Sequence, residues 1–411
     1  MKRVILVLLG CWNVIFAIIP FIESETKAVQ TPTVILVSMD GFRADYFDRV
    51  KTPHFEAFRR SGTQAANLKP VFPSVTFVNH YSIITGRYAE HHGIVNNSMW
   101  DPKTERTFEI SDSDEVNRSD WWEGEPIWVT AEKQGVTTGT LFWVGSSAEI
   151  AGKRPTYWLP YDESFSKNQR VDKVLEWLDR PELKRPKLIT LYFEDVDQAG
   201  HRYGPHSEEV AQAISKLDEA FGRLLTGLKA RGLENKTYIL LVSDHGMAEV
   251  KRSNRIRLKN YIQGSETRIV GKGALSLVWP KDENAKLNIL ERVKKLPGHF
   301  KLFKKESIPE RFHYSEHRRI APLVFLADEG WYLDSGVLPS LKPEVFGLHG
   351  YDNDNKNMQA IFVWKGPGVQ SGNKVGEVQN VDIYSLLAHL LKVEPANHDG
   401  NLQRIKKVLQ Y

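Results

Sequence analysis

The chain has 411 residues, of which 41% are hydrophobic and 26% are charged, and its formal net charge is +4 at pH 7. This length and apolar content exclude a disordered chain and fit one large α/β domain or two smaller ones. The charge is mild and no stretch is dense in lysine and arginine, so we expect no stable complex with nucleic acid.

The first segment has the pattern of an export signal. A basic start, Met1–Arg3, precedes the almost wholly apolar residues 4–22, and polar residues follow. We therefore expect residues 1–24 to be a signal peptide or an N-terminal membrane anchor, and the protein to be exported, either periplasmic or secreted. Cys11 is the only cysteine, and the apolar run continues past it, which argues against lipid attachment there. Residues 25–411 therefore contain neither a disulfide nor a thiolate.

Apolar, β-branched runs that end in acidic residues predict a sheet of parallel strands. "TVILVSMD" ends at Asp40, "KLITLYFEDVD" ends at Asp197, and "TYILLVSDH" ends at Asp244 and His245. Near-continuous apolar runs are typical of parallel strands that are buried on both faces. Further strands are expected at residues 137–145, 321–328 and 359–366.

Helical patterns lie between these strands. Apolar residues recur at helical spacing from Val171 to Leu178 and from Val210 to Leu228. The alternation predicts an α/β fold with helices on both faces of the sheet, in which ligands bind beyond the carboxyl ends of the strands. Residues from about 250 to 319 are more charged and less regular, so we expect an inserted cap region within a single domain that spans residues 25–411.

Thr76 in "FPSVTFVNH" has two interpretations. It stands ahead of an apolar-periodic run, where a threonine usually caps a helix by accepting a hydrogen bond from a free backbone N–H group. The same place favours an anion, because the free N–H groups and the helix dipole point toward it. A role as nucleophile would also require a metal ion, since the pKa of an alcohol lies far above 7.

Histidines accompany the strand-end carboxylates. Asp197 and His201 are four residues apart, which puts both on one face if a helical turn follows the strand. Asp244 and His245 are adjacent, and a bend after the strand can direct both to one point. His349 lies between glycines that allow a sharp turn. A single aspartate at a strand end is usually a cap, but this set asks for a joint explanation.

With Asp40, the set contains three carboxylates and three imidazoles. Nitrogen and oxygen ligands without thiolate suit Zn²⁺, with Mn²⁺ or Fe as alternatives. Six ligands divide into two three-ligand sites, each with an open position. Two metal ions about 4 Å apart can bind the attacking and leaving oxygens of an in-line displacement at phosphorus.

Five blocks of the sequence together resemble a known family. "MDGFR" around Asp40, "PVFPSVTFVNHYSIITGRYAEHHGIVNN" around Thr76, "DVDQAGHRYGP", "SDHGM" and "HGYDN" are similar to the nucleotide pyrophosphatase/phosphodiesterase family of the alkaline phosphatase superfamily. The blocks follow the family's order over roughly residues 34–391. The resemblance implies an alkaline-phosphatase-like fold with a parallel-rich central sheet, and a single catalytic domain as in bacterial members.

The resemblance also implies a role for each matched residue, and two Zn²⁺ ions per chain. The ligands of the first ion would be Asp40, Thr76, Asp244 and His245, and those of the second would be Asp197, His201 and His349. Thr76 would be the nucleophile and would form a phospho-threonine intermediate. Asn97 matches the family's phosphate-binding amide, although it could also be an ordinary turn residue.

Aromatic residues bear on the substrate. Phe77 follows the nucleophile position, where the family lines a nucleobase slot, and Tyr192 and Tyr157 match other slot positions by order, although each could simply pack in the core. We expect a monomer that hydrolyses a nucleotide phosphodiester or pyrophosphate and releases a nucleoside 5′-monophosphate. The alternatives are a choline-phosphodiester substrate of the lysophospholipid or sphingomyelin type and, more remotely, a non-catalytic binding module.

Overall fold

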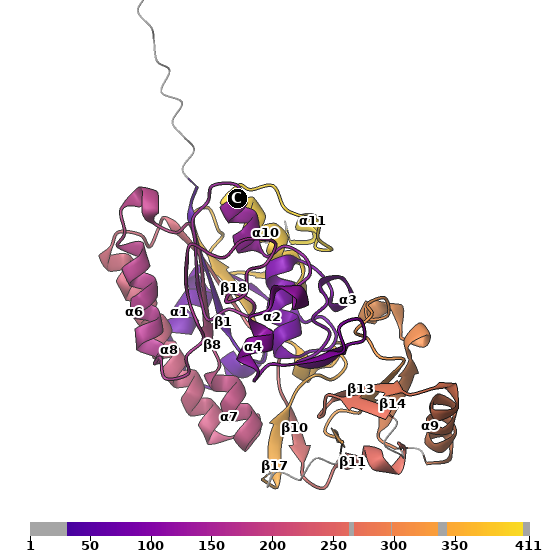
Figure 1. Ribbon diagram of the computed structural model, residues 1–411. Coiled ribbons are helices and arrows are strands. Elements are labelled where there is room, and N and C mark those ends of the chain that lie inside the picture. The colour runs from indigo at the N-terminus through magenta and orange to yellow at the C-terminus, as the bar shows by residue number, and fades with distance from the viewer. Residues whose placement is uncertain (1–30, 263–266, 297, 336–342, 406–411) are drawn as a thin grey trace, which may run out of the picture. The chain divides into compact units, whose positions relative to one another are not determined.

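The structure is a computed structural model, and it describes residues 31–262, 267–296, 298–335 and 343–405 (Figure 1). Residues 1–24, which we expect to be a signal peptide or anchor, lie outside the described residues, and Cys11 lies among them. Among the residues that the structure describes, none of the helices combines the length and the apolar character that a bilayer span requires.

A mixed sheet of eight strands carries the fold. The strand order is β19 (Asn373–Val375), β2 (Thr63–Ala65), β18 (Phe362–Lys365), β9 (Thr237–Val242), β1 (Thr33–Met39), β8 (Leu188–Phe193), β6 (Thr138–Leu141) and β7 (Tyr157–Leu159). The five neighbours from β9 to β7 are parallel to one another. β18 runs antiparallel to both β9 and β2, and β19 pairs with β2 in parallel. The sheet is therefore parallel at its centre and mixed at one side.

The central strand β1 is buried on both faces. Val34 and Leu36 belong to the hydrophobic cluster on one face, whereas Ile35 and Val37 belong to the cluster on the other face. Because side chains alternate along a strand, a run of consecutive apolar residues requires apolar cover on both sides.

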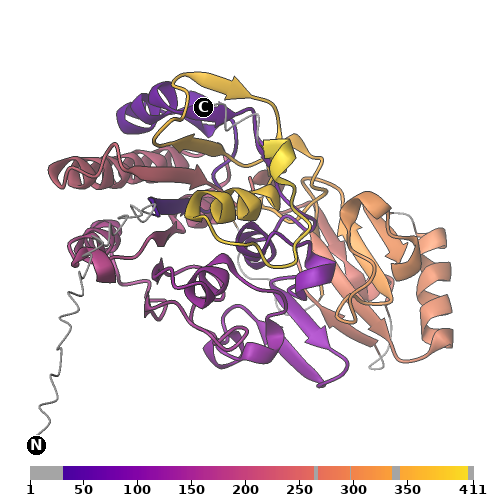
Figure 2. The same ribbon diagram turned by 90° about the horizontal axis from the view of Figure 1, so that it is seen from above.

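Helices provide this cover on both faces (Figures 1 and 2). One layer contains α1 (Pro53–Ser61), α6 (Lys167–Leu178) and α8 (Glu208–Ala230). The other layer contains α2 (Thr76–Thr85), α5 (Ile127–Lys133) and α10 (Asp382–Leu391). The predicted α/β class with helices on both faces is confirmed, and the two predicted helical patterns fall within α6 and α8.

Two predicted strands are real but do not run parallel with the central strands. The run at residues 359–366 contains β18, which is antiparallel to its neighbour β9. The run at residues 321–328 contains β15 (Leu323–Ala327), which belongs to a different, antiparallel sheet. An apolar run identifies a buried strand, but its direction and its partners are set by residues far away in the chain.

The segment between β9 and β18 builds that second sheet. Its order is β12 (Thr267–Val270), β13 (Leu275–Pro280), β15 and β14 (Phe300–Lys304), all antiparallel, and α9 (Glu283–Lys295) connects β13 to β14. Figure 2 shows this sheet and α9, in orange, at one side of the main sheet. Residues about 250–319, which we expected to be an inserted cap, fall in this segment, and its sheet continues to Ala327.

Shorter elements connect these parts. They are β3 (Leu68–Lys69), α3 (Ala89–His92), β4 (Ser98–Asp101), β5 (Arg106–Glu109), α4 (Ser113–Val116), α7 (Asp195–Tyr203), β10 (Ala248–Lys251), β11 (Arg255–Arg257), β16 (Tyr332–Asp334), β17 (Val345–Leu348), β20 (Val378–Gln379) and α11 (Leu402–Ile405).

The carboxyl ends of β1, β8 and β9 lie level with one another. Met39 pairs with Phe193, and Ser38 pairs with both Tyr192 and Val242. The residues that directly follow these three strands therefore meet at one edge of the sheet, which is where ligands bind in parallel α/β folds.

Candidate active site

Thr76 is the first residue of α2 and lies beside a cluster from β1 and β9. The helix is capped by the backbone of Val75, without a side-chain capping bond, so Thr76 is not the N-cap residue. Its Oγ1 atom is instead 3.2 Å from the Nε2 atom of His245. That Nε2 atom is also 2.9 Å from Oδ2 of Asp244 and 3.5 Å from Oδ1 of Asp40. The hydroxyl thus contacts an imidazole that itself lies against two carboxylates.

A second cluster adjoins the first. Asp197 and His201 project from α7, and His349 follows β17. The Nε2 atoms of the two histidines are 3.0 Å apart, and each lies 3.5–3.6 Å from an oxygen of Asp197. The His349 ring also stacks on that of His245, with 3.7 Å between ring centroids. The two clusters are therefore continuous.

Backbone carbonyls fix how the histidine rings of the second cluster are protonated. Nδ1 of His201 lies 2.9 Å from the carbonyl oxygen of Gly347, and Nδ1 of His349 lies 2.9 Å from that of Ser74. A carbonyl oxygen only accepts, so each Nδ1 carries the proton. The two Nε2 atoms that face each other can then share only a proton or a metal ion. A ring held by its Nδ1–H with Nε2 turned inward is the usual arrangement of a metal ligand.

Three carboxylate oxygens in these clusters are buried and have no hydrogen-bond partner: Oδ1 of Asp40, Oδ1 of Asp197 and Oδ2 of Asp244. Burying an acceptor without a partner is costly, so a cation is the natural counterpart for all three. Ligand atoms within 4.8 Å of one another form two groups: Asp40, Asp244 and His245, and Asp197, His245 and His349. These nitrogen and oxygen ligands fit the expected Zn²⁺ ions.

Burial disfavours charge on two groups of the cluster. Burial, together with the charges of Asp244 and Asp197, raises the pKa of Asp40 well above its ordinary value. Burial, together with His245 and His201, lowers the pKa of His349 well below its ordinary value. Both groups are therefore pushed toward their neutral forms in the metal-free protein, and a bound cation would favour the ionised carboxylate.

Tyr192 contacts this cluster directly. Its side chain is 9% exposed, and its hydroxyl donates a hydrogen bond of 2.7 Å to Oδ2 of Asp40. Burial and the charge of Asp40 raise the pKa of the Tyr192 hydroxyl well above its ordinary value, so it remains a donor. The structure therefore places Tyr192 where it orients the Asp40 carboxylate.

Asn97 and Phe77 are linked to each other. The backbone N–H of Phe77 donates to Oδ1 of Asn97 at 3.0 Å. With its oxygen occupied in this way, the Asn97 amide presents its NH₂ group as a donor. The ring of Phe77 is half-buried and packs on Trp122 and Phe108, at centroid distances of 6.2 Å and 5.9 Å. Phe77 is in the first turn of α2, and Asn97 reaches that turn from the loop before β4.

Residues 34–352 match the protein family described as "Type I phosphodiesterase / nucleotide pyrophosphatase". The match takes in both clusters and Thr76. The chain belongs to this family. The resemblance seen in the sequence is confirmed.

Relatives of this family member include snake-venom and mammalian proteins. The chain is 37% identical over 396 residues to venom phosphodiesterase CdcPDE of Crotalus durissus collilineatus, and the alignment covers 93% of this chain and 47% of that protein. The chain is 37% identical over 394 residues to human ectonucleotide pyrophosphatase/phosphodiesterase family member 1, and this alignment covers 93% of this chain and 42% of that protein. The chain therefore spans less than half the length of these relatives.

Solved structures of the family share the fold. The murine ectonucleotide pyrophosphatase/phosphodiesterase 5, solved in an inactive form in complex with AMP, superposes with a TM-score of 0.86 and 34% sequence identity. The comparison covers 92% of this chain and 99% of that one. This confirms the predicted alkaline-phosphatase-like fold.

In this family member, Tyr157 lies apart from the other residues expected at the site. It belongs to the edge strand β7, its ring stacks on Trp177 at 6.1 Å, and its hydroxyl donates to the Lys184 carbonyl at 2.9 Å. Tyr161, which the sequence analysis did not name, lies beside Tyr192. It is 49% exposed, and its ring centroid is 6.4 Å from that of Tyr192.

The sequence analysis missed Tyr161, although a signal for it exists. Pro160 directly follows β7, and proline lacks the N–H group that a strand interior needs. Tyr161 therefore comes just after the carboxyl end of a parallel strand, which is the side of the sheet that binds ligands.

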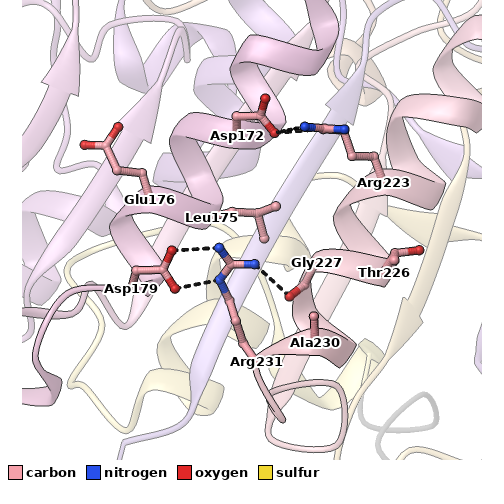
Figure 3. Close-up of a pocket in the computed structure, with 9 residues that line it drawn as sticks. All are labelled: Asp172, Leu175, Glu176, Asp179, Arg223, Thr226, Gly227, Ala230 and Arg231. Atoms are coloured by element: carbon pink, nitrogen blue, oxygen red, sulfur yellow. Dashed lines mark hydrogen bonds and ion pairs between the residues drawn. The ribbon is translucent and has the colours of Figure 1, made fainter.

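Two surface hollows differ in their relation to the site. One, of about 790 Å³, is lined by Asp197 and His201 together with residues of α7 and α8, so it opens beside the second cluster. The other, of about 640 Å³, lies between α6 and α8 (Figure 3). Its arginines are already paired, Arg223 with Asp172 and Arg231 with Asp179, as the dashed lines in Figure 3 show. The first hollow is the one that can serve the site.

Proposed function

We propose that this chain is a two-zinc hydrolase that cleaves nucleotide phosphodiester or pyrophosphate bonds and releases nucleoside 5′-monophosphates. The observation that carries the proposal is the position of Thr76, whose hydroxyl lies 3.2 Å from His245 at the start of a helix and beside a cluster of unpartnered carboxylate oxygens. Membership of the phosphodiesterase family supports the same reaction class.

Each zinc ion would have its own set of ligands. Asp40, Asp244 and His245, with the hydroxyl of Thr76, would hold one ion, and Asp197, His201 and His349 would hold the other. When bound, the ions would lower the pKa of the Thr76 hydroxyl and offset negative charge on the reacting phosphate.

The covalent steps are carried by Thr76. Its oxygen gives up its proton to solvent, attacks phosphorus and forms a P–O bond, while the bond to the leaving group breaks and the leaving oxygen departs with the electron pair and takes up a proton. Water then attacks phosphorus, the bond between Thr76 and phosphorus breaks, and a proton from the water restores the hydroxyl, giving a nucleoside 5′-monophosphate. The Asn97 amide donates to a non-bridging oxygen, where negative charge develops, and the N-terminus of α2 favours the same anion.

The base would lie against aromatic residues. Phe77 adjoins the nucleophile and is supported from behind by Trp122 and Phe108. Tyr161 offers an exposed ring on the side of Tyr192. Any nucleobase can stack on such faces. A nucleotide substrate is also supported by the murine relative, which was solved with AMP.

We propose further that the protein is exported and acts as a monomer on small nucleotides. The relatives named venom phosphodiesterase and ectonucleotide pyrophosphatase/phosphodiesterase support this location. Fractionation of the source cells would test it: activity in the soluble cytosolic fraction would contradict export, whereas activity in a membrane fraction would indicate the anchored form.

The test of the function compares substrates and variants. A chromogenic thymidine 5′-monophosphate diester and a phosphorylcholine ester are offered to the zinc-loaded protein, with and without a chelator. We expect metal-dependent turnover that favours the nucleotide diester. Faster turnover of the choline ester would move the substrate to lipids, and no turnover of any ester with zinc bound would favour the non-catalytic alternative.

Variants then isolate the nucleophile. Thr76→Ala should lose about a thousandfold or more in kcat while keeping its fold and its bound zinc, and Thr76→Ser should retain part of the activity. Thr85→Ala is the matched control, because Thr85 ends the same helix and only donates to the carbonyl of Tyr81. If Thr76→Ala kept a kcat near that of Thr85→Ala, Thr76 would not be the nucleophile.

A further inference from the structure

A buried histidine that takes no part in the covalent steps touches both the nucleophile's backbone and a carboxylate of the cluster. His80 lies one helical turn after Thr76 and has no exposed surface. Its Nδ1 atom is 3.0 Å from the carbonyl oxygen of Thr76 and 3.3 Å from Oδ2 of Asp244. Its Nε2 atom is 2.8 Å from the hydroxyl of Ser38.

These contacts determine which nitrogen of His80 carries the proton. A carbonyl oxygen and a carboxylate oxygen only accept, so the nitrogen that faces both must be Nδ1–H. In the neutral ring Nε2 then accepts from the Ser38 hydroxyl. The N–H bond donates to the Thr76 carbonyl, and its positive end also faces the Asp244 carboxylate. The two acceptors at Nδ1 thus set the tautomer, and the Ser38 hydroxyl provides a partner for Nε2 in it.

The ring of His80 has little freedom to turn. Its centroid lies 5.2 Å from those of Trp143 and Tyr192, both edge-on, and the Trp143 indole N–H donates to the carbonyl of His80 itself at 3.1 Å. Ser38 is on β1, two residues before Asp40. The ring therefore connects the strand that carries one carboxylate with the helix that carries Thr76.

We propose that His80 is a positioning residue for phosphoryl transfer. Its single N–H group donates to the Thr76 carbonyl and faces Oδ2 of Asp244, and the Ser38 hydroxyl donates to the other nitrogen of the same ring. The inference rests on the proposed function, in which Thr76 is the nucleophile and Asp244 binds the metal that activates it. Without the N–H group, the distance between the nucleophile and that carboxylate is no longer fixed. The loss affects the reacting geometry more than substrate binding, so kcat falls more than KM rises.

The test exploits the two amide side chains that imitate one histidine nitrogen each. His80→Asn places an N–H group near the position of Nδ1, whereas His80→Gln places it near the position of Nε2. For His80→Gln we expect kcat for the nucleotide diester to fall roughly 10- to 100-fold, with KM within about threefold of wild type. His80→Asn should stay within about fivefold of the wild-type kcat.

The metal affinity is measured separately from turnover. Titration of zinc against a chromophoric chelator should show weaker binding at one of the two sites in His80→Gln, by roughly 10-fold or more, and near-normal binding in His80→Asn. Ser38→Ala provides a second, milder variant in case His80→Gln does not fold. It should lower kcat about three- to tenfold, because the ring keeps its contacts to the two acceptors but loses its donor.

His92 offers a matched control. It is equally buried, and its Nε2 atom pairs with the Ser82 hydroxyl at 2.9 Å, but its Nδ1 atom accepts from the backbone N–H of Ile94 instead of facing the cluster. His92→Asn and His92→Gln should lower the melting temperature as the His80 variants do, while kcat and zinc affinity stay at wild-type values.

Three results would overturn the proposal. The first is a wild-type kcat in His80→Gln. The second is an equal loss of kcat in His80→Asn and His80→Gln. The third is a loss of kcat in the His92 variants as large as in His80 variants with the same fall in melting temperature, because kcat would then report only stability. If the wild-type protein hydrolyses no diester, the proposed function fails, and the zinc affinities of the same variants still decide whether His80 positions Asp244.

Discussion

Removing one hydroxyl from Tyr192 should weaken metal binding without unfolding the protein. Tyr192→Phe deletes the donor that lies 2.7 Å from Oδ2 of Asp40 and leaves the ring, which is 9% exposed, in place. Asp40 is 1% exposed, so water cannot replace the lost donor without a rearrangement. The change therefore isolates one hydrogen bond to a carboxylate of the proposed metal site.

The size of the effect follows from the charge of the acceptor. A hydrogen bond to a charged group is worth about 1.5–3 kcal/mol, and each 1.36 kcal/mol corresponds to a factor of ten in an equilibrium constant. Burial and the neighbouring carboxylates raise the pKa of Asp40, whereas the hydrogen bond from Tyr192 lowers it. Its loss raises that pKa further, so protons compete better with the metal. We expect zinc affinity at the Asp40 site to fall roughly 10- to 100-fold.

The assay is a competitive titration of zinc against a chromophoric chelator at pH 7.5. Tyr314→Phe is the matched control, because the Tyr314 hydroxyl is also buried and also donates at 2.7 Å, but to the carbonyl of Val95. That control should lose about 1 kcal/mol of unfolding free energy and keep the wild-type zinc affinity. Equal affinities for Tyr192→Phe and wild type would refute the reasoning, as would an equal loss in the control.

Three further predictions concern other parts of the molecule. Asn97→Ala should lower kcat for the nucleotide diester by roughly 100-fold or more at little-changed KM, in steady-state kinetics. Tyr161→Ala should raise KM for that diester roughly tenfold or more, whereas Tyr157→Ala should leave it unchanged; the reverse order would put the base on the other tyrosine. Asp101→Asn should lower the free energy of unfolding by about 3–5 kcal/mol at neutral pH, because Asp101 and Arg319 are both 1% exposed and bonded at 2.8 Å. Burial alone would raise the pKa of Asp101, but hydrogen bonds from arginines hold it well below its ordinary value. The stabilisation by the ionised Asp101 is therefore fully present above pH about 4 and is lost as the pH falls further. In denaturant titrations the difference in unfolding free energy between Asp101→Asn and wild type should shrink below that pH.

The position of the site at the sheet edge could be predicted because its signals are local. A buried parallel strand is recognised in the sequence as an apolar run. The residue that follows the run lies at the carboxyl end of the strand, whichever strands pair with it. Asp40 and Asp244 follow β1 and β9, so the pattern places both at this edge, and the pairing of the two strands in the structure brings them together. Thr76 needed the joint pattern, because a helix start by itself predicts only a cap.

Strand direction and the tyrosine that lies beside Tyr192 could not be predicted in this way. The runs that became β15 and β18 look like the central strands, but their partners lie far away in the chain. Tyr157 was expected at the site only from its order in the family pattern, whereas the position of Tyr161 follows from the end of β7 at Leu159. The hydrogen bond from Tyr192 to Asp40 depends on strand pairing as well.

The contact between His349 and the carbonyl of Ser74 bears on when the site can form. The two residues are 275 positions apart, and the hydrogen bond between them orients the His349 ring, a proposed ligand of the second cluster. A chain that has emerged only as far as α8 would have Asp40, Asp197 and His201, but no geometry that holds a cation tightly. Metal would therefore bind last, once the segment after the second sheet has returned to the main one. From then on a bound ion stabilises the complete fold by mass action. Removal of the ion would loosen the segment that carries His349 before it affects the central strands.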